Sequence, residues 1–295
     1  MADRTLKNIF EYLLFLPLAA LFRLLPRTLA LRTGEQIGRI APHILPRRKR
    51  TAMKNLRLAY PEKEEAEIAA ICARMFRHLG ISAAEMIRLD KLNSERDLKR
   101  YFKVEGMENL EKAKAMNRGI LIASAHLGFW EVGAFFFPQV GVFLDGVAKK
   151  AKNPYVDRYF RRMREHAGCQ VIDAKHGARR VVKSLSDKRA VGVLIDHHMT
   201  PKASVQVPYF GRLAWTTPII TQIAMKRQIP VIPVFFFRTD DLNYRVEIGE
   251  VILFDNEITE ENVMANTALL TEKIEAAVRK EPSQWFWVHR RWRVS

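Results

Sequence analysis

The chain has 295 residues, of which 48% are hydrophobic and 27% are charged, so it holds enough apolar side chains for a core and is unlike a disordered protein. Its 49 lysines and arginines outnumber its 32 aspartates and glutamates, giving a formal net charge of +17. This excess predicts anionic partners: nucleic acid, an anionic membrane surface, phosphorylated substrates or an acidic carrier protein. The two cysteines, Cys72 and Cys169, make neither a disulfide framework nor a metal-ligand pattern, which favours a reducing, cytosolic setting.

The N-terminus carries an apolar run of 11 residues, Tyr12–Phe22. A helix that spans a bilayer needs about 20 apolar residues, so three interpretations stay open: a shallow membrane anchor, a buried core helix and a signal peptide. Basic residues that would attract anionic lipid headgroups follow the run and favour the anchor. They are Arg23, Arg27, Arg32, Arg47, Arg48, Lys49 and Arg50.

The first hundred residues have helical patterns, including Arg27–Leu45, which Pro46 closes, and Glu62–Leu89. Short apolar runs then predict buried strands: Gly119–Ala125, Val142–Ala148, Cys169–Asp173, Ala190–Asp196, Pro230–Phe237 and Tyr244–Ile252. Helical stretches lie between and after them: Trp130–Pro138, Pro154–Ala167, Gly177–Asp187, Thr217–Arg227 and Glu261–Lys280. This alternation predicts an α/β fold with a largely parallel central sheet flanked by helices. We assign residues 1–45 to an anchor and helical segment, and residues 46–295 to the main domain.

In such sheets, the chemistry gathers beyond the carboxyl ends of the strands, which directs attention to residues 124–131 and 196–199. Residues five apart on a regular helix lie about 140° apart, so His126 and Glu131 can meet only across a turn, which Gly128 permits. A carboxylate that orients a neutral imidazole makes it a general base for an attacking hydroxyl. The alternative is an ordinary strand–turn–helix junction with a satisfied histidine and a solvated glutamate.

The segment Ala125–Glu131 (AHLGFWE) resembles the motif of a histidine, four residues and an acid that marks the glycerolipid acyltransferase superfamily, in the form found in bacterial lipid A late acyltransferases. Further segments resemble that family in the same order along the chain. They are Asn55–Glu62, Phe76–Gly80, Lys152–Pro154 with Asp157, Val207–Arg212 and Gln284–Trp292. Together they cover nearly the whole chain from about residue 45, and the apolar N-terminus matches as well.

The resemblance implies an acyltransferase that moves a fatty acyl chain from a thioester, carried by acyl carrier protein, to a hydroxyl of a lipid A precursor. It implies His126 as the base, Glu131 as its support and no cofactor or metal. Localisation would be the inner membrane, with the catalytic domain on the cytoplasmic side and an anionic membrane surface as a partner. The substrate-binding candidates are Arg164, Asp196, Lys149, Lys152, Asn153 and Arg212. Asp196 would orient the substrate or a basic partner.

One departure from the family pattern concerns Asp196-His197-His198, where the family usually has an acid, a glutamine and an acid. The second acid is lost, which raises the prospect of an altered acceptor. A metal site at these residues is disfavoured because no third ligand appears at metal-site spacing. Ser124 could form an acyl-enzyme, but no nucleophile elbow surrounds it, so we favour direct transfer.

Two other functions stay open. An acyltransferase that acts on a lysophospholipid or another glycolipid would use the same residues. A basic membrane-binding or nucleic-acid-binding protein without enzymatic activity would explain the charge, although no nucleic-acid-binding motif is present and we expect no nucleic acid partner. Trp285, Trp287 and Trp292 could pack the C-terminal segment onto the core or lie at a lipid interface. Phe135, Phe136 and Phe137 favour a core position over an acyl tunnel.

Overall fold

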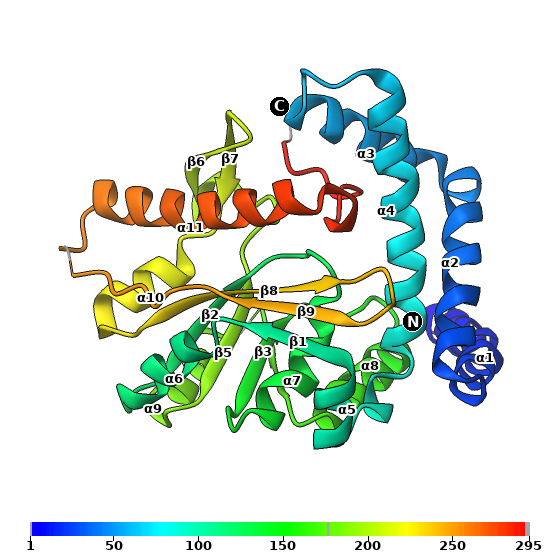
Figure 1. Cartoon of the computed structure of the whole chain (residues 1–295), viewed down its shortest axis with the longest axis horizontal. Coiled ribbons are helices and arrows are strands. Elements are labelled where there is room, and N and C mark those ends of the chain that lie inside the picture. Colours follow the sequence, from blue (N-terminus) through cyan, green and yellow to red (C-terminus); the bar gives the residue numbers. More distant parts are fainter. Residues whose placement is uncertain (1, 176, 256, 293–295) are drawn as a thin grey trace.

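A computed structural model describes residues 2–175, 177–255 and 257–292, with the side chains of residues 2–4 left out (Figure 1). The α-helices are α1 (Ala2–Leu24), α2 (Arg27–Ile44), α3 (Pro46–Ala59), α4 (Glu65–Met86), α5 (Glu95–Tyr101), α6 (Met107–Ala115), α7 (Gly133–Gln139), α8 (Pro154–His166), α9 (Ala178–Ser186), α10 (Ile219–Arg227) and α11 (Glu260–Lys280). Short 3₁₀ turns are η1 (Leu89–Lys91), η2 (Trp130–Val132), η3 (Pro201–Ala203) and η4 (Pro282–Gln284).

The described strands form a seven-stranded sheet and a separate two-stranded hairpin. In the sheet they are β1 (Phe102–Glu105), β2 (Ile120–Ser124), β3 (Leu144–Ala148), β4 (Gln170–Asp173), β5 (Ala190–Leu194), β8 (Val231–Arg238) and β9 (Tyr244–Ile248). Their order is β1-β9-β8-β2-β5-β3-β4, and each neighbouring pair is parallel except β8 with β9. The largely parallel sheet flanked by helices confirms the predicted α/β class.

The core lies on both faces of this sheet, as expected for parallel strands covered by helices. Helices α6 and α7 pack on one face, and α9, α10 and α11 pack on the other. Strand β2 is buried along its whole length, whereas the last three residues of both β3 and β5 stay partly accessible. The sheet therefore leaves space at the carboxyl ends of its central strands, where the site is built.

Helix α2 packs closely against α4 because both helices carry glycine where they meet. A side chain at Gly80 would collide with the backbone of Gly34 and Gly38. Helix α4 begins with a capping box, in which Glu64 and Glu67 each bond the backbone of the other. Pro46 does close the segment before it, as predicted, but it also starts α3 at a position where proline suits a helix.

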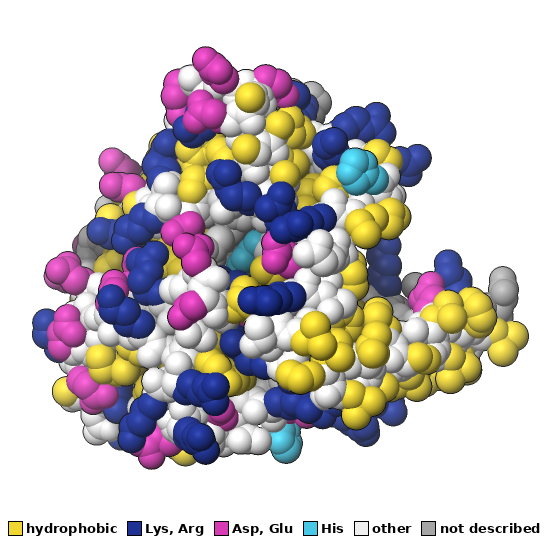
Figure 2. Space-filling model, turned by 45° about the vertical axis from the view of Figure 1, so that its right-hand side comes forward, with side chains coloured by type: hydrophobic (Ala, Val, Ile, Leu, Met, Phe, Trp, Pro, Cys, Tyr) yellow, Lys and Arg dark blue, Asp and Glu magenta, His cyan; other side chains and the backbone are white. Residues whose placement is uncertain are grey.

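Helix α1 is long and apolar enough, between Thr5 and Leu24, to cross a membrane, and only 11% of its most apolar window is buried. Phe15, Ala19 and Phe22 face the rest of the protein, whereas Leu14 and Leu21 are exposed. The core-helix interpretation is therefore wrong for most of this segment. Figure 2 shows apolar side chains gathered along the projecting arm at its right-hand side.

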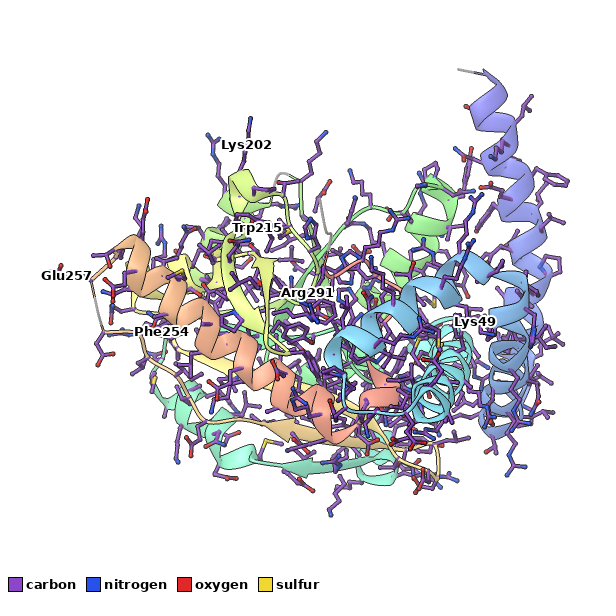
Figure 3. All side chains as sticks on the ribbon, turned by 90° about the horizontal axis from the view of Figure 1, so that it is seen from above. Lys49, Lys202, Trp215, Phe254, Glu257 and Arg291 are labelled. Atoms are coloured by element: carbon purple, nitrogen blue, oxygen red, sulfur yellow. The ribbon has the colours of Figure 1, made fainter. Side chains whose placement is uncertain are left out.

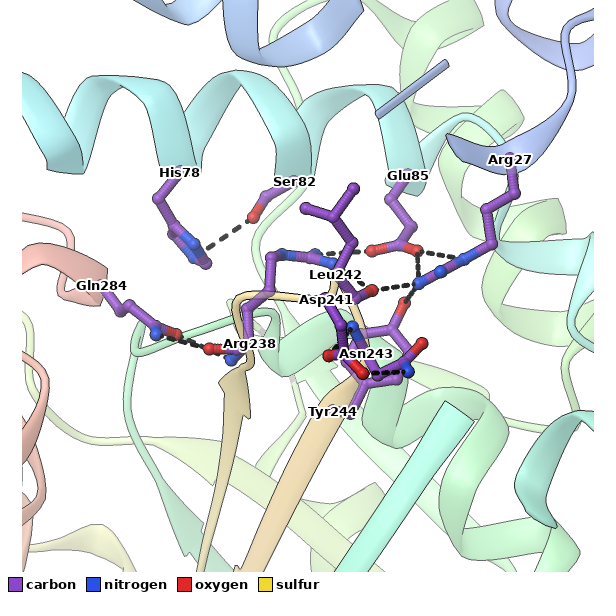
Figure 4. A network of polar contacts seen from close by, with 10 residues as sticks. All are labelled: Arg27, His78, Ser82, Glu85, Arg238, Asp241, Leu242, Asn243, Tyr244 and Gln284. Carbon is purple, nitrogen blue, oxygen red and sulfur yellow. Dashed lines mark hydrogen bonds and ion pairs between the residues drawn. The ribbon is translucent and has the colours of Figure 1, made fainter. Parts of the chain in front are cut away.

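A buried ionic network ties the N-terminal helices to the sheet (Figure 4). The Glu85 carboxylate on α4 receives hydrogen bonds from Arg27 of α2 at 2.8 and 3.1 Å and from Arg238 of β8 at 2.5 Å. Arg23 is likewise paired, with Asp90 at 2.6 and 2.8 Å. These two N-terminal arginines serve the fold, so the predicted attraction to lipid headgroups is left to Arg32 and residues 47–50, which are exposed.

The antiparallel hairpin of β6 (Val205–Tyr209) and β7 (Arg212–Thr216) was not predicted, because Val207–Arg212 was identified only as a segment that resembles the family and was assigned no strand. Strand β1 was also missed, being four residues long and half-exposed. The other predicted strands are present, with ends shifted by at most four residues.

The network around Glu85 gives a prediction about stability. In Glu85→Ala, two arginines lose their buried counter-ion, so we expect unfolding free energy to fall by about 3–5 kcal/mol in urea denaturation. Glu65→Gln, which breaks an exposed pair with Arg57, is the matched control and should leave the urea midpoint unchanged. Equal midpoints for the two variants would contradict a stabilising role for the network.

A second prediction concerns pH. Burial and the charge of Arg238 lower the pKa of His78 on α4 to about 4, from 6.5 in an unfolded chain. Between these values the unfolded chain binds a proton that the folded protein does not, so stability should fall as pH drops from 6.5 to 4, by up to about 1.4 kcal/mol per pH unit. Urea midpoints measured across this range should fall less steeply in His78→Phe than in the wild type. An unchanged slope would show that His78 is not responsible, and His166→Asn, at the exposed end of α8, is the control.

Candidate functional site

A cavity of about 1650 Å³ lies at the carboxyl ends of β2, β3 and β5. Its walls are mostly apolar, and His126, Glu131 and Arg164 are among the polar residues that line it. Sites of this kind, concave and apolar with a few convergent polar groups, are where small molecules bind.

The His126 ring is held by Asp196, which lies just beyond the neighbouring strand β5. The distance from His126 Nδ1 to Asp196 Oδ1 is 2.8 Å, and the other carboxylate oxygen accepts bonds from the His126 backbone N–H at 2.9 Å and from Trp285 Nε1 at 2.8 Å. The Asp196 side chain is fully buried, whereas 19% of the His126 side chain is exposed. One histidine is thus fixed by a buried carboxylate at the edge of the cavity.

The ionisation of Asp196 determines what the imidazole can do. Burial alone would raise the pKa of the Asp196 carboxyl, but the charge of His126 and its hydrogen bonds outweigh burial and hold that pKa well below its usual range. An ionised carboxylate can only accept hydrogen bonds, so Nδ1 donates its N–H to Asp196, and the neutral ring has its lone pair on Nε2. This tautomer can take a proton from a hydroxyl in the cavity.

The predicted hydrogen-bonded pair of His126 and Glu131 is not formed. Gly128 makes the expected turn with φ of +60°, and the chain then enters η2. Both carboxylate oxygens of Glu131 accept hydrogen bonds from Arg164 of α8, each at 2.7 Å. The bidentate pair uses Nε and Nη2 of Arg164. Glu131 therefore supports Arg164, and Asp196 takes the position predicted for Glu131.

Three imidazole rings form a stack at the site. His197 lies parallel to His126 with ring centroids 3.7 Å apart, and His289 lies on the other side of His197 at 3.9 Å. Burial lowers the pKa of His197 to about 3 and that of His289 to about 4. Both rings are therefore neutral at neutral pH and hold the plane of His126 without adding charge.

His126, Asp196 and His197 bring their ligand atoms within 4.8 Å of one another, close enough for a metal to be considered. The two rings are parallel to within 2°, so their in-plane lone pairs run side by side and do not converge on one point. Asp196 already accepts three hydrogen bonds. The geometry suits proton transfer better than coordination.

The remaining predicted binding residues fall into two groups. Lys149 lines the cavity together with Arg164. Asn153 instead caps α8 and donates to the Asn8 carbonyl and Glu11 of α1, at 2.8 and 3.0 Å, so its contacts are structural. Lys152 is exposed outside the cavity, and Arg212, on β7, donates to the Leu58 carbonyl at 3.2 Å. The predicted set is thus brought together only in part.

The C-terminal segment supplies functional contacts that sequence reasoning missed. Trp285 is almost fully buried and bonds Asp196, and Trp287 and Trp292 are also buried, so the lipid-interface interpretation is wrong for them. The sequence did place Trp285 in a segment that resembles the family, and a tryptophan has one N–H that needs an acceptor when it is buried. Nothing in the sequence identified Asp196 as that acceptor. Ser124 donates its hydroxyl to the Val234 carbonyl at 2.6 Å, an arrangement that does not activate a nucleophile.

Known proteins resemble this chain along most of its length. It is 26% identical to the lipid A biosynthesis lauroyltransferase of Escherichia coli K12 over 278 residues, which is 92% of this chain and 87% of that protein. The palmitoleoyltransferase and the myristoyltransferase of the same organism are 26% and 23% identical, covering 88% and 86% of this chain and 84% and 77% of their own lengths.

Among solved structures, the 1-acyl-sn-glycerophosphate acyltransferase of Thermotoga maritima superposes with a TM-score of 0.41 at 14% identity, covering 88% of this chain and 99% of that one. The family model for bacterial lipid A biosynthesis acyltransferases matches residues 3–294. A match over nearly the whole chain establishes that this protein belongs to the bacterial lipid A biosynthesis acyltransferase family.

Proposed function

We propose that this protein transfers a fatty acyl group from the thioester of acyl carrier protein to a hydroxyl of a lipid A precursor, with His126 as general base and Asp196 as the residue that orients it. The observation that carries the proposal is the buried Asp196–His126 pair at 2.8 Å beside a large apolar cavity. Family membership supplies the reaction class, and the site supplies residues suited to it.

The reaction follows from the tautomer of His126. Nε2 accepts the proton of the acceptor hydroxyl while its oxygen attacks the thioester carbonyl, and Asp196 stabilises the imidazolium that forms. The tetrahedral intermediate then collapses: the carbon–sulfur bond breaks, and the imidazolium returns its proton to the departing thiolate. The acyl group ends as an ester on the acceptor.

The transferred chain has a suitable place on the sheet face covered by α7. Gly146 of β3 and Gly192 of β5 are paired in register and leave a trough without side chains. The buried residues Phe137, Leu144 and Cys169 wall this trough. We call this part of the cavity the closed arm. A fatty chain ends in a methyl group and needs one opening only, at its carbonyl, so a blind slot suits it.

The proposed partners are anionic, which suits the charge of the chain. Lys149 and Lys202 belong to the cavity wall and are exposed, and Figure 3 shows Lys202 pointing outward from the body of the protein. An acidic carrier protein and the phosphates of a lipid A precursor would both be attracted to such a rim.

We propose the inner membrane as the location, with the catalytic domain on its cytoplasmic side and α1 as the anchor. The exposed apolar face of α1 continues onto α2, where Leu29, Ile37, Ile40 and Ile44 are exposed along one side of the helix. An exposed apolar surface of this extent would be covered by lipid.

The catalytic proposal is tested by His126→Ala and Asp196→Asn in a transfer assay with acyl carrier protein as donor. Loss of the base or of its correct tautomer should lower the rate by about 10²–10⁴-fold. His166→Ala, at an exposed histidine outside the cavity, should keep wild-type activity. If a folded Asp196→Asn variant retains more than half of the activity, Asp196 does not orient the base.

The anchor proposal is tested by the double variant Leu14→Glu/Leu21→Glu, whose positions are 62% and 50% exposed and therefore contribute little to the core. Replacing two inserted leucines by charges should weaken binding to anionic vesicles at least ~100-fold in co-sedimentation. Leu213→Glu, at an exposed leucine on the hairpin, is the control and should bind as the wild type does. Equal binding of the double variant would exclude α1 as the anchor.

A further inference from the structure

The cavity extends onto both faces of the central sheet. Its wall includes Phe137, Leu144 and Phe236, which belong to the core cluster on the α7 face, and also Val181, Ile220 and Val263, which belong to the cluster on the α9–α11 face. Because the sheet separates these two clusters, the cavity must pass around the carboxyl ends of the strands, where His126 lies.

The alternation of side chains along β5 shows how the two parts are separated. Val191 and Ile195 pack into the cluster on the α9–α11 face, so Val193 points to that face, and Gly192 and Leu194 point to the α7 face. Gly192 and Val193 are neighbours in sequence and both line the cavity, on opposite sides of one strand. Gly192 belongs to the closed arm, and Val193 belongs to a second part.

We call this second part the open arm; it runs between α9, α10 and the start of α11, over Val147 and Val193. Its walls are apolar, like those of the closed arm, but its outer end differs. Ile219, Ile258 and Met264 line it and are 37%, 55% and 46% exposed. The open arm therefore reaches the surface past exposed apolar side chains, with Glu260 and Glu261 near Ile258 in the sequence, whereas the closed arm ends among buried side chains.

The volume argues for more than one ligand chain. Pockets that hold one drug-sized molecule occupy about 300–1000 Å³, and this cavity holds about 1650 Å³. Acyl transfer to a lipid brings two amphiphiles to one histidine. The chain that is transferred has a free methyl end and fits a blind slot, whereas a chain of the acceptor stays attached to a bulky head group and needs a passage open to the surface.

We propose that the open arm binds a hydrocarbon chain that remains on the acceptor lipid, so that the two faces of the sheet hold the chains of the two substrates. This proposal rests on the proposed acyl transfer, since it assigns the second substrate of that reaction. The outer end of the open arm also carries two exposed carboxylates, Glu260 and Glu261, and Lys202 belongs to the same cavity wall, so the proposal rests on the apolar passage and not on charge.

The test compares Val193→Phe, which fills the open arm, with Gly192→Ala, which narrows the closed arm. A Cβ at Gly192 would meet only the end of the Leu144 side chain, at 3.4 Å, so that variant fits without a backbone shift. Both variants and the wild type are assayed in detergent micelles, with acyl carrier proteins bearing chains of different length and with an acceptor in full-length and chain-shortened forms.

We expect Val193→Phe to raise the KM for the full-length acceptor at least ~10-fold, the effect of losing about two buried methylene groups, with the donor chain-length preference unchanged. The shortened acceptor should be affected much less. Gly192→Ala should shift the donor preference to shorter chains and leave the acceptor KM unchanged. A Val193→Phe variant that alters donor preference, or that leaves the acceptor KM unchanged, overturns the proposal.

Two further measurements keep the test decisive. If Val193→Phe does not fold, Ile258→Glu replaces it; this rim residue is more than half exposed, and the charge should raise the acceptor KM in the same direction. An unchanged acceptor KM in that variant would also overturn the proposal. Wild-type protein that transfers no acyl chain would instead refute the proposed function itself, so the two failures are distinguishable.

Discussion

The site depends on one buried carboxylate. Asp196 accepts two hydrogen bonds from His126 and one from Trp285, and an ionised group without such partners would be costly to bury. These bonds join three segments that lie far apart in the sequence: the turn after β2, the end of β5 and the C-terminal segment. The same carboxylate therefore orients the imidazole of His126 and holds the C-terminal segment against the sheet.

Backbone contacts complete this junction. The Phe286 N–H donates to the His126 carbonyl at 3.0 Å, and the Gly128 N–H donates to the Gln284 carbonyl at 3.0 Å. Gly128 has a left-handed φ and lies so close to the Phe236 carbonyl that a side chain there would collide with it. The glycine is thus required both by the turn and by the close approach of β8.

Much of the fold could be predicted from the sequence because its strands are short apolar runs bounded by turn residues. His126 and Asp196 were both singled out because each follows such a run. Their pairing could not be deduced, because it depends on β2 and β5 being neighbours in the sheet. The spacing of apolar residues along one strand does not determine which strands lie next to each other. Glu131 was predicted as the partner because the turn at Gly128 would allow contact and because the segment resembles the family's histidine–acid motif, whereas the actual partner is 70 residues away.

The parts that were missed have a common physical reason. The hairpin is stabilised by the pairing of β6 with β7 and by the packing of β6 against α11. A local sequence pattern does not reveal such contacts. The binding residues carried over from the resemblance failed in a similar way: Asn153 lies in a matching segment, yet its side chain holds α8 to α1. A motif locates a segment, but the contacts of each side chain decide its role.

The two ionic pairs at the cavity are kept separate, and this separation suits the proposed reaction. Glu131 is neutralised by Arg164 in a bidentate pair, so the charge of Asp196 is the one left for His126. With the imidazole neutral, Asp196, Glu131 and Arg164 carry a net charge of −1. When the imidazole takes the proton of the acceptor hydroxyl, the total charge of these residues and the substrate does not change: the imidazolium is paired with Asp196, and the negative charge moves to the oxygen of the tetrahedral intermediate. The neutral His197 and His289 rings that extend the stack leave this balance unchanged, because neither contributes a competing positive charge beside the imidazolium.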